Sequence, residues 1–288
     1  MRMPANLKVS LDGRIVPIAA ARVSVFDRGF LFGDGVYETV RTYAGRPFRL
    51  SAHLARLAAS ARRLGIRVPP GIPAAVGATL RANRLEGARV RIVLTRGAGS
   101  IELADPLSTR PTILVYAVPY SPPPESAYRD GVAAIIPATV RNDQRSLDPA
   151  IKSLNLLNAF LAVREARRAG AREAIMLNTA GRVAEAAAAN VFFVRRGVLC
   201  TPALGSGILP GITRELVLDL ARRLGFPVRE AAFPPRDLVQ ADEAFVTAST
   251  IEILPLSMIN ARRYPVSRPY TRALMTAYRV TVEDELGS

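Results

Sequence analysis

Two lysines, Lys8 and Lys152, are the only amine side chains among the 39 lysine and arginine residues of this chain. Lys8 lies in a polar N-terminal segment, whereas Lys152 follows the turn-like pair Asp148-Pro149 and directly precedes an apolar periodic run. A lysine can lose its proton and attack a carbonyl, which an arginine cannot do in a protein. The pattern favours Lys152 as an amine nucleophile, and the alternative is a lysine placed there by chance.

One carboxylate and one anion-binding segment could work with such an amine. Glu185 lies among small apolar residues, where an unpaired carboxylate would be costly, so a buried partner is expected for it. Otherwise it is a surface glutamate at the end of a strand. Gly211 precedes Ile212 and Thr213 at the start of a periodic apolar run, and free backbone N–H groups at such a helix start can bind phosphate. The alternative is an ordinary helix cap by Thr213.

Two hydroxyls follow the last buried strand that the sequence predicts. That strand occupies residues 243–248, and Ser249 and Thr250 come directly after it. These hydroxyls could add donors to the same anion site, or they could simply begin a turn. A reactive lysine, a buried carboxylate and a phosphate-binding helix start are together what pyridoxal phosphate requires. The lysine forms the imine, the carboxylate keeps the pyridine nitrogen protonated, and the phosphate anchors the group.

The elements that must hold these residues follow from hydrophobic spacing. A helix is predicted over residues 153–169, so that Lys152 would precede its N-terminus, where the positive end of the helix dipole disfavours a charged amine. A predicted strand places Tyr37 and Glu38 on opposite faces. A predicted helix with a leucine stripe leaves Arg56 on its solvent side.

Length and composition limit the class of protein. With 288 residues, 49% of them hydrophobic, the chain can form one or two globular domains. No apolar run approaches the ~18 residues that span a bilayer. The N-terminus lacks the apolar core of a secretory signal, and a single cysteine, Cys200, excludes an internal disulfide framework. These features predict a cytoplasmic protein without membrane partners.

The formal net charge of +15 raises the question of nucleic-acid binding, since phosphate neutralisation alone can hold a polyanion. The arginines, however, are spread along the whole chain, with no dense run, no interleaved aromatic residues and no zinc-finger spacing. The charge is therefore interpreted as surface solvation, with no specific nucleic-acid partner. Small anionic ligands are the expected partners.

The sharpest change in composition occurs at residues 120–126, which contain three consecutive prolines. Such a run cannot lie inside a helix or a central strand, so it predicts an extended linker. The predicted division is an N-terminal domain at residues 1–119 and a larger C-terminal domain at residues 127–288.

Over residues 24–255 the chain resembles the class IV, or fold-type IV, aminotransferases, a family of D-amino-acid transaminases, branched-chain aminotransferases and aminodeoxychorismate lyases. The resemblance implies an α/β (α+β) fold with a small α/β N-terminal domain and a larger pseudo-barrel C-terminal domain. It also implies a cofactor in the cleft between them and a homodimer. It rests on four motifs in the family's order: Asp27-Arg28-Gly29 with Gly33-Asp34-Gly35-Val36-Tyr37-Glu38, Ile151-Lys152-Ser153-Leu154-Asn155, Glu185 with Asn190-Val191-Phe192, and Gly211-Ile212-Thr213-Arg214.

The same resemblance implies a role for each matching residue. Lys152 looks like the Schiff-base lysine that also moves the substrate proton, and Glu185 looks like the partner of the pyridine nitrogen. Arg56 matches the family arginine that reaches the phosphate, against its exposed place on the helix wheel. Tyr37 matches an active-site tyrosine near cofactor and substrate. The implied phosphate ligands are Ile212, Thr213, Ser249 and Thr250.

The chain departs from the best-known D-amino-acid transaminases, which hold the substrate carboxylate with an Arg-x-His element a few residues after Thr-Arg-Gly. Thr95-Arg96-Gly97 is present here, but residues 98–103 contain neither arginine nor histidine. Arg28 and Arg96 are the candidates for that task, because a guanidinium suits bidentate carboxylate binding. Alternatively, each forms a structural salt bridge. Alanines at residues 186–189 replace the usual serines, so hydrogen bonding around the cofactor is expected to be weaker.

The resemblance implies a transaminase that moves an amino group between an amino acid, expected to be a D-amino acid, and a 2-keto acid such as 2-oxoglutarate or pyruvate by a ping-pong mechanism. Within the family, the alternatives are a branched-chain L-amino-acid aminotransferase and an aminodeoxychorismate lyase. The alternative from another class is a basic, non-catalytic binding protein with a vestigial cofactor fold.

Overall fold

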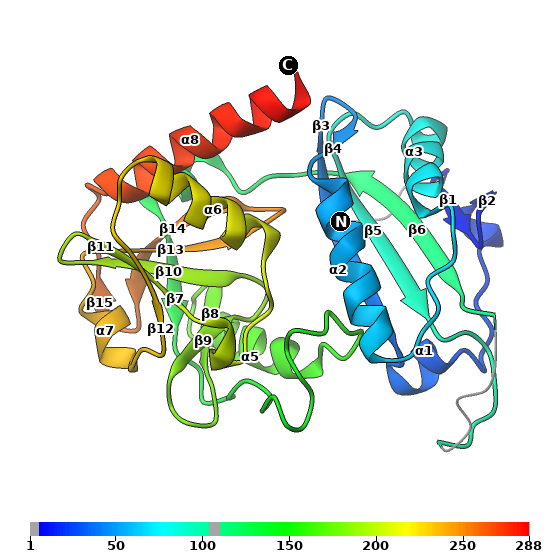
Figure 1. The fold of residues 1–288 in the computed structure, drawn as a ribbon, viewed down its shortest axis with the longest axis horizontal. Coiled ribbons are helices and arrows are strands. Elements are labelled where there is room, and N and C mark those ends of the chain that lie inside the picture. The colour runs from blue at the N-terminus through cyan, green and yellow to red at the C-terminus, as the bar shows by residue number, and fades with distance from the viewer. Residues whose placement is uncertain (1–5, 104–109, 288) are drawn as a thin grey trace. The chain divides into compact units, whose positions relative to one another are not determined.

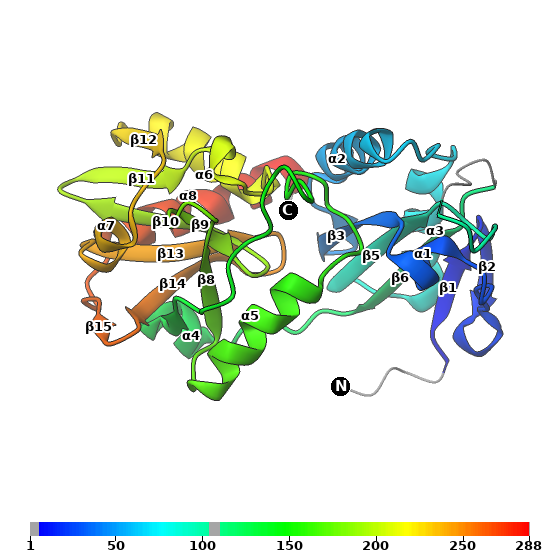
Figure 2. The same ribbon diagram turned by 90° about the horizontal axis from the view of Figure 1, so that it is seen from below.

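The computed structural model describes residues 6–103 and 110–287, which form two compact units. The first unit runs to Ser121 and also takes in residues 151–155, and the second contains residues 122–150 and 156–287. Figures 1 and 2 show the elements of each unit. The boundary after Ser121 lies inside the proline-rich segment at residues 120–126.

The first unit is built on a six-stranded antiparallel sheet in the order β2-β1-β6-β5-β3-β4. Along β5, alternate residues are fully buried, so one face of the sheet is apolar, and α2 and α3 pack on that face. The elements of this unit are β1 (Lys8–Leu11), β2 (Arg14–Pro17), η1 (Ile18–Ala20), α1 (Arg28–Phe32), β3 (Gly35–Tyr43), β4 (Arg46–Pro47), α2 (Leu50–Arg63), α3 (Ile72–Asn83), β5 (Ala88–Thr95) and β6 (Ile113–Pro119).

The second unit contains a nine-stranded mixed sheet in the order β12-β11-β10-β13-β14-β7-β8-β9, with β15 paired to β14. Its edge strand β9 also contacts β10 and β11, so the sheet curls towards itself. The strands are β7 (Val132–Ile135), β8 (Glu173–Leu177), β9 (Val183–Ala186), β10 (Asn190–Arg195), β11 (Val198–Pro202), β12 (Val228–Ala231), β13 (Glu243–Ala248), β14 (Glu252–Ile259) and β15 (Arg262–Arg263). The helices are α4 (Glu125–Asp130), α5 (Leu157–Arg168), η2 (Leu204–Ser206), α6 (Ile212–Arg223), α7 (Pro235–Val239) and α8 (Pro269–Leu286).

The core of the second unit lies around β10 and β13, whose residues are nearly all buried. The register pairs Phe192 with Phe245, and their rings stack with centroids 5.1 Å apart. Continuous apolar runs of this kind are expected where a strand is covered on both faces. The sheet therefore provides a rigid base for the loops at its strand ends.

The segment around Lys152 differs from the sequence prediction. The helix α5 begins at Leu157 rather than at residue 153, so Lys152 does not stand at a helix N-terminus. Residues 151–155 are instead extended along the start of β3, where Ser153 forms a β-bridge with Val36 and Leu154 donates to the carbonyl of Gly35. The prediction that a helix dipole acts on Lys152 is therefore wrong, because the backbone of Ser153 and Leu154 pairs with β3 and does not begin a helix.

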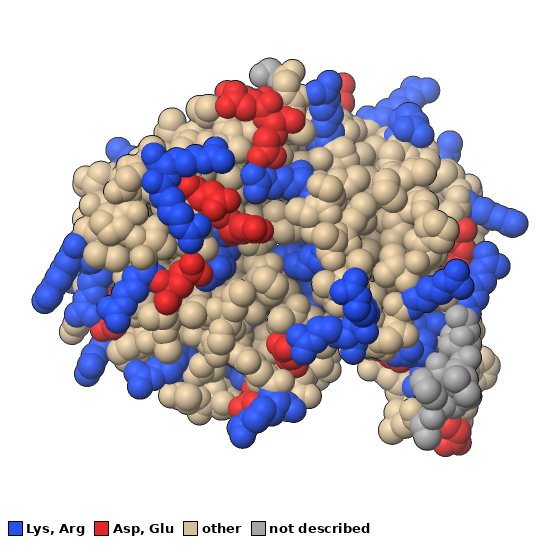
Figure 3. Space-filling model, viewed as in Figure 1, with Lys and Arg blue, Asp and Glu red and all other residues tan. Residues whose placement is uncertain are grey.

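Two general predictions bear on the surface. No helix within residues 6–103 and 110–287 is long and apolar enough to cross a membrane. Figure 3 shows arginine and lysine side chains scattered among uncharged residues on the face that it draws, with acidic groups between some of them. A scattered distribution of this kind is typical of surface solvation.

Candidate active site

Lys152 is held against the sheet of the first unit by backbone contacts. Its carbonyl accepts a hydrogen bond of 3.0 Å from the Tyr37 N–H, and its own N–H donates to Ser60 Oγ at 3.2 Å. Its amine Nζ lies 4.6 Å from the centroid of the Tyr37 ring. An extended backbone with both neighbours paired leaves the long side chain as the mobile part of the residue. The amine can therefore move while its anchor stays fixed.

The Tyr37 ring also contacts Arg91, a residue that the sequence patterns did not single out. The guanidinium carbon of Arg91 lies 3.5 Å from the centroid of the Tyr37 ring, and its Nη1 donates to Thr39 Oγ1 at 2.9 Å. The signal was present in the strand alternation, since Thr39 faces Arg91 in the β3–β5 register and Tyr37 lies on the same face. One aromatic ring thus contacts both a primary amine and a guanidinium.

On the opposite face of β3, Glu38 forms a buried cluster with α2. Its carboxylate accepts two hydrogen bonds from Arg56, from Nε at 2.7 Å and from Nη2 at 2.8 Å, and one contact of 2.7 Å from His53 Nδ1. Glu38 is fully buried, and His53 is the only histidine of the chain. Tyr37 and Glu38 lie on opposite faces, as the strand pattern predicted.

The protonation states of this cluster follow from its geometry. Burial by itself raises the pKa of Glu38, but the hydrogen bonds and charges of Arg56 and His53 outweigh it and lower the pKa to about 2. Burial lowers the pKa of His53, Glu38 opposes that change, and the positive charges of Arg56 and Lys152 add to the lowering. The imidazole is therefore neutral at pH 7, with Nδ1–H donating to the ionised Glu38.

Arg56 accordingly has a fixed place. Its side chain is 12% exposed, so the helix-wheel prediction of a solvent-facing residue is wrong. The wheel considers only apolar partners, whereas the buried Glu38 draws the guanidinium onto the sheet. Two of its nitrogens are held by one carboxylate, which orients the planar group.

In the second unit, Glu185 is 5% exposed and has the buried partners that its apolar setting predicted. Arg141 Nε donates to Oε1 at 3.0 Å, the backbone N–H of Leu209 donates to Oε2 at 3.0 Å, and Asn190 Nδ2 lies 3.3 Å from Oε2. All three partners are donors, which suits an ionised carboxylate. Arg141 was not expected from the sequence, where no local pattern distinguishes it from other arginines.

The start of α6 is tied to the same group of residues. Asn190 Nδ2 also donates to the carbonyl of Leu209 at 2.9 Å, which holds the turn leading to Gly211. A Cβ atom on Gly211 would lie 1.9 Å from Asn190 Oδ1, so any larger residue there would have to displace the Asn190 side chain. No side chain caps the first turn of α6 within the described residues, and Ile212 and Thr213 are both buried there. The first backbone N–H groups of this helix lack intrahelical acceptors and can receive an anion.

Ser249 and Thr250 lie in the turn that joins β13 to β14. In the β10–β13 register Asn190 pairs with Thr247, two residues before Ser249. The two hydroxyls therefore emerge at the same end of the sheet as Asn190. The structure thus brings Glu185, Asn190 and the start of α6 together and sets this turn at the adjoining strand end.

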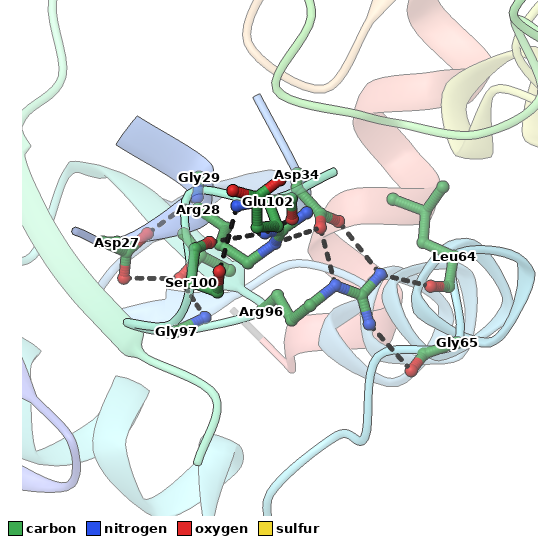
Figure 4. Close-up of polar contacts among 11 residues, drawn as sticks. Asp27, Arg28, Gly29, Asp34, Leu64, Gly65, Arg96, Gly97, Ser100 and Glu102 are labelled. Atoms are coloured by element: carbon green, nitrogen blue, oxygen red, sulfur yellow. Dashed lines mark hydrogen bonds and ion pairs between the residues drawn. The ribbon is translucent and has the colours of Figure 1, made fainter. Parts of the chain in front are cut away.

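Arg28 and Arg96, the candidates for the substrate carboxylate, converge on one aspartate of the first unit (Figure 4). Arg28 Nε lies 3.5 Å from Asp34 Oδ2, and its Nη1 donates to the carbonyls of Ser100 and Glu102 at 2.8 and 3.0 Å. Arg28 is 5% exposed. Arg28 therefore connects the loop after β5 to α1.

Arg96 binds the other side of the same carboxylate. Its Nε and Nη2 donate to Asp34 at 2.6 and 3.1 Å, and its Nη2 also donates to the carbonyl of Leu64 at the end of α2, at 2.6 Å. The bidentate pair is therefore made with Asp34 in this structure. The structural salt bridge that was the alternative for both arginines is present, and their role towards a substrate stays a prediction.

The family model for amino-transferase class IV matches residues 35–259, which contain Tyr37, Arg56, Lys152, Glu185 and the start of α6. The chain belongs to the class IV aminotransferases. It is an enzyme of fold type IV, and its cofactor is pyridoxal 5′-phosphate. The resemblance inferred from the sequence motifs is confirmed, as are the fold class and the cofactor.

Relatives of this class IV aminotransferase carry two kinds of name. A protein of Methanocaldococcus jannaschii with a provisional assignment as a branched-chain-amino-acid aminotransferase is 41% identical over 259 residues, 89% of each chain. A D-alanine aminotransferase of Listeria innocua is 38% identical over 260 residues, 88% of each chain. The solved branched-chain aminotransferase of Thermoproteus uzoniensis is 35% identical with a TM-score of 0.89, covering 96% of this chain and 94% of that one.

The residues present fit pyridoxal phosphate. The uncapped start of α6 offers backbone donors for a phosphate, and the contact between Asn190 and Gly211 keeps that turn tight. Glu185 offers a buried carboxylate for a protonated ring nitrogen. Lys152 offers the amine. Each group has the donor or acceptor character that its partner on the cofactor requires.

Proposed function

We propose that this aminotransferase moves an amino group between a D-amino acid and a 2-keto acid such as 2-oxoglutarate or pyruvate, in two half-reactions. The observation that supports a transaminase chemistry is the amine of Lys152 against the Tyr37 ring, on an anchored backbone. The motif from Lys152 to Leu157 and the D-alanine aminotransferase relatives support the D-amino-acid assignment.

The roles of the residues follow from their chemistry. When bound, pyridoxal phosphate supplies a carbonyl that condenses with amines and a ring that accepts electrons from the substrate α-carbon. Lys152 Nζ would hold the cofactor at rest and, once its amine is free, would move the proton from the substrate α-carbon to the cofactor. The Glu185 carboxylate would keep the ring nitrogen protonated, and the hydrogen bond that it accepts from Arg141 holds it in place.

Binding of the phosphate is assigned to the first N–H groups of α6, to the Thr213 hydroxyl, and to Ser249 and Thr250. Arg56 adds a positive charge whose orientation Glu38 sets through two hydrogen bonds. These assignments come from the family motif and from the donor character of each group. Tyr37 is assigned to the substrate side, because its ring contacts the amine of Lys152.

For the substrate carboxylate, Arg91 joins Arg28 and Arg96 as a candidate. The guanidinium of Arg91 stacks on the Tyr37 ring that Lys152 also contacts, and it donates a hydrogen bond to the neutral hydroxyl of Thr39. Arg28 and Arg96 share Asp34 and would have to give up an existing ion pair to bind a substrate. The contacts of Arg91 with Thr39 and Tyr37 involve no carboxylate that a substrate would have to displace.

A branched-chain L-amino-acid aminotransferase is the second candidate, because the 41% identical relative carries that name provisionally and the solved structure at 35% identity carries it too. The deciding test adds D-alanine, D-glutamate and L-leucine separately to the cofactor-loaded protein and follows the visible absorption band of the lysine-bound cofactor. Loss of the band with either D-amino acid supports the proposal. A response to L-leucine alone refutes the D-amino-acid assignment and establishes the second candidate.

The transaminase chemistry itself is tested by Lys152→Ala, with Lys8→Ala as the matched control, since Lys8 is the only other lysine and is exposed. Lys152→Ala is expected to lose the visible band and all turnover, while Lys8→Ala keeps both. A wild-type protein that stayed colourless after incubation with pyridoxal phosphate would instead favour a non-catalytic binding protein. A homodimer and a cytoplasmic location remain predictions, which sedimentation and cell fractionation test.

A further inference from the structure

A cavity lies in the second unit, and neither Glu185 nor the first residues of α6 line it. It has a volume of about 410 Å³ and is bounded by α4, α8 and the strand β14. Cavities of this size accommodate small molecules. None of the residues assigned to the cofactor or the substrate lines it.

The lining of this cavity is strongly basic. Four arginines contribute to it, namely Arg129 from α4 and Arg268, Arg272 and Arg279 from α8 or its N-cap, against one carboxylate, that of Glu125. Spacings of four and seven residues place the three α8 arginines on one face of the helix. Side chains of like charge so arranged repel one another unless an anion lies between them.

Among the described residues, only one of the four arginines that line the cavity forms an ion pair. Arg129 forms an ion pair with its neighbour Asp130, at 2.8 Å. Within the part of the chain that the structure describes, no carboxylate lies within ion-pair distance of Arg268, Arg272 or Arg279. Three guanidinium charges therefore face this space. Glu125 in the lining, and Glu243 and Asp130 acting on Arg268 from beyond ion-pair distance, offset these charges only in part.

One of these positive charges, that of Arg268, is buried in the fold. The residue is 2% exposed, its Nη2 donates to the carbonyl of Asp130 at 3.0 Å and its Nη1 to that of Arg129 at 3.4 Å, and its buried Nε has no hydrogen-bond partner among the described residues. Burial of this charge is costly, and Glu243 and Asp130 offset the cost only in part, so the pKa of the Arg268 guanidinium is lowered. A bound anion would offset that cost.

The N-terminus of α8 is not the source of the positive potential. Glu243 already accepts hydrogen bonds from the Tyr270 and Thr271 N–H groups, at 3.1 and 2.8 Å, and from Thr271 Oγ1 at 2.7 Å. The free donors at this helix end are thus satisfied by a buried carboxylate. The attraction for an anion comes from the arginine side chains.

We propose that this cavity binds a small anion that bears at least two negative charges, carried by phosphoryl or carboxylate groups. Guanidinium groups bind both kinds of oxyanion in a planar, charge-assisted manner. Tyr128, Pro255 and Met275 supply apolar surface for the uncharged part of such a ligand. The site is separate from the catalytic residues, so the proposal does not rest on the proposed substrate.

Isothermal titration of the cofactor-loaded protein tests the proposal, in phosphate-free buffer at low ionic strength, with inorganic pyrophosphate and with citrate as separate probes. The variant is Arg272→Gln combined with Arg279→Gln, both exposed and outside the catalytic residues. The matched control is Arg164→Gln combined with Arg168→Gln, which removes two exposed arginines from α5. The net charge of the two double variants is the same.

We expect saturable binding of one probe molecule per chain, weakened about tenfold or more in the cavity variant and less than twofold in the control. The probe that binds more tightly identifies the ligand as a phosphoryl or a carboxylate compound. Absence of saturable binding for both probes overturns the proposal. Equal weakening in the two double variants also overturns it, since the binding would then follow net charge. So does displacement of the visible cofactor band by the probe at the same concentrations, since the probe would then occupy the catalytic site.

Discussion

Replacing Glu38 with glutamine removes the charge that holds Arg56 and His53 on the sheet of the first unit. The carboxylate is fully buried, and its pKa lies at about 2 against an ordinary value of 4.5. A difference of that size corresponds to about 3 kcal/mol of folding stability when the group is ionised. Breaking a buried ion pair from one side costs about 3–5 kcal/mol, which agrees with this figure.

The sign of the pH effect follows from the direction of the shift. Because the folded-state pKa is lowered, the contribution of Glu38 is fully present above pH 4.5 and is lost as the pH falls from 4.5 towards 2. Glu38→Gln should therefore be less stable than the wild type by about 3 kcal/mol at pH 7 and by much less near pH 3. Its cofactor affinity should also fall, because Arg56 loses its orientation.

Chemical denaturation of the two proteins at pH 7, 5 and 3 measures the difference, with Glu86→Gln as the control because Glu86 is exposed on the same unit. Glu86→Gln should change the free energy of unfolding by well under 1 kcal/mol at each pH. A Glu38→Gln protein as stable as the wild type at pH 7 would refute the assignment of a stabilising buried ion pair. A destabilisation that stayed constant down to pH 3 would refute the titration argument.

Four further substitutions test other parts of the molecule. Gly211→Ala forces a Cβ to within 1.9 Å of Asn190 Oδ1, so the affinity for pyridoxal phosphate, followed by equilibrium dialysis, should drop about tenfold or more. Burial raises the pKa of Glu173 to about 7, so its protonated carboxyl stabilises the fold below pH 4.5, and this contribution is lost as the pH rises through 7. Thermal unfolding should therefore show Glu173→Gln to be more stable than the wild type by about 2–3 kcal/mol at pH 8. At pH 4.5 the two proteins should be equally stable. Arg91→Gln should raise KM for the amino acid while the cofactor stays bound, whereas Arg96→Ala should chiefly lower the melting temperature. If Arg91→Gln lowered the melting temperature and left KM unchanged, Arg91 would have a structural role and would not bind the substrate carboxylate.

The buried ion pairs explain why arginine content alone was a poor guide to function. Arg28, Arg56 and Arg96 each bind a carboxylate of the first unit, and Arg141 binds Glu185 in the second. A chain with this composition uses arginine both to solvate its surface and to order its interior. Only the identity of the partner distinguishes the two uses.

Local patterns in the sequence determined much of this protein. Alternation along β3 set Tyr37 and Glu38 on opposite faces, and the apolar setting of Glu185 predicted its buried partners. The single internal lysine and the glycine before α6 were recognisable because few residue types can do their chemistry. Such features are local, since strand alternation and turn geometry depend on neighbours in the chain.

The tertiary structure alone decided which groups meet. Lys152 lies on the first unit because its backbone pairs with β3, not because a helix begins beside it. The register of β3 and β5 places Arg91 against the Tyr37 ring. Arg28 and Arg96 both form ion pairs with Asp34. These contacts join residues far apart in the chain. Periodicity records only which face of an element is apolar, and it does not specify the partner that a buried polar group will find.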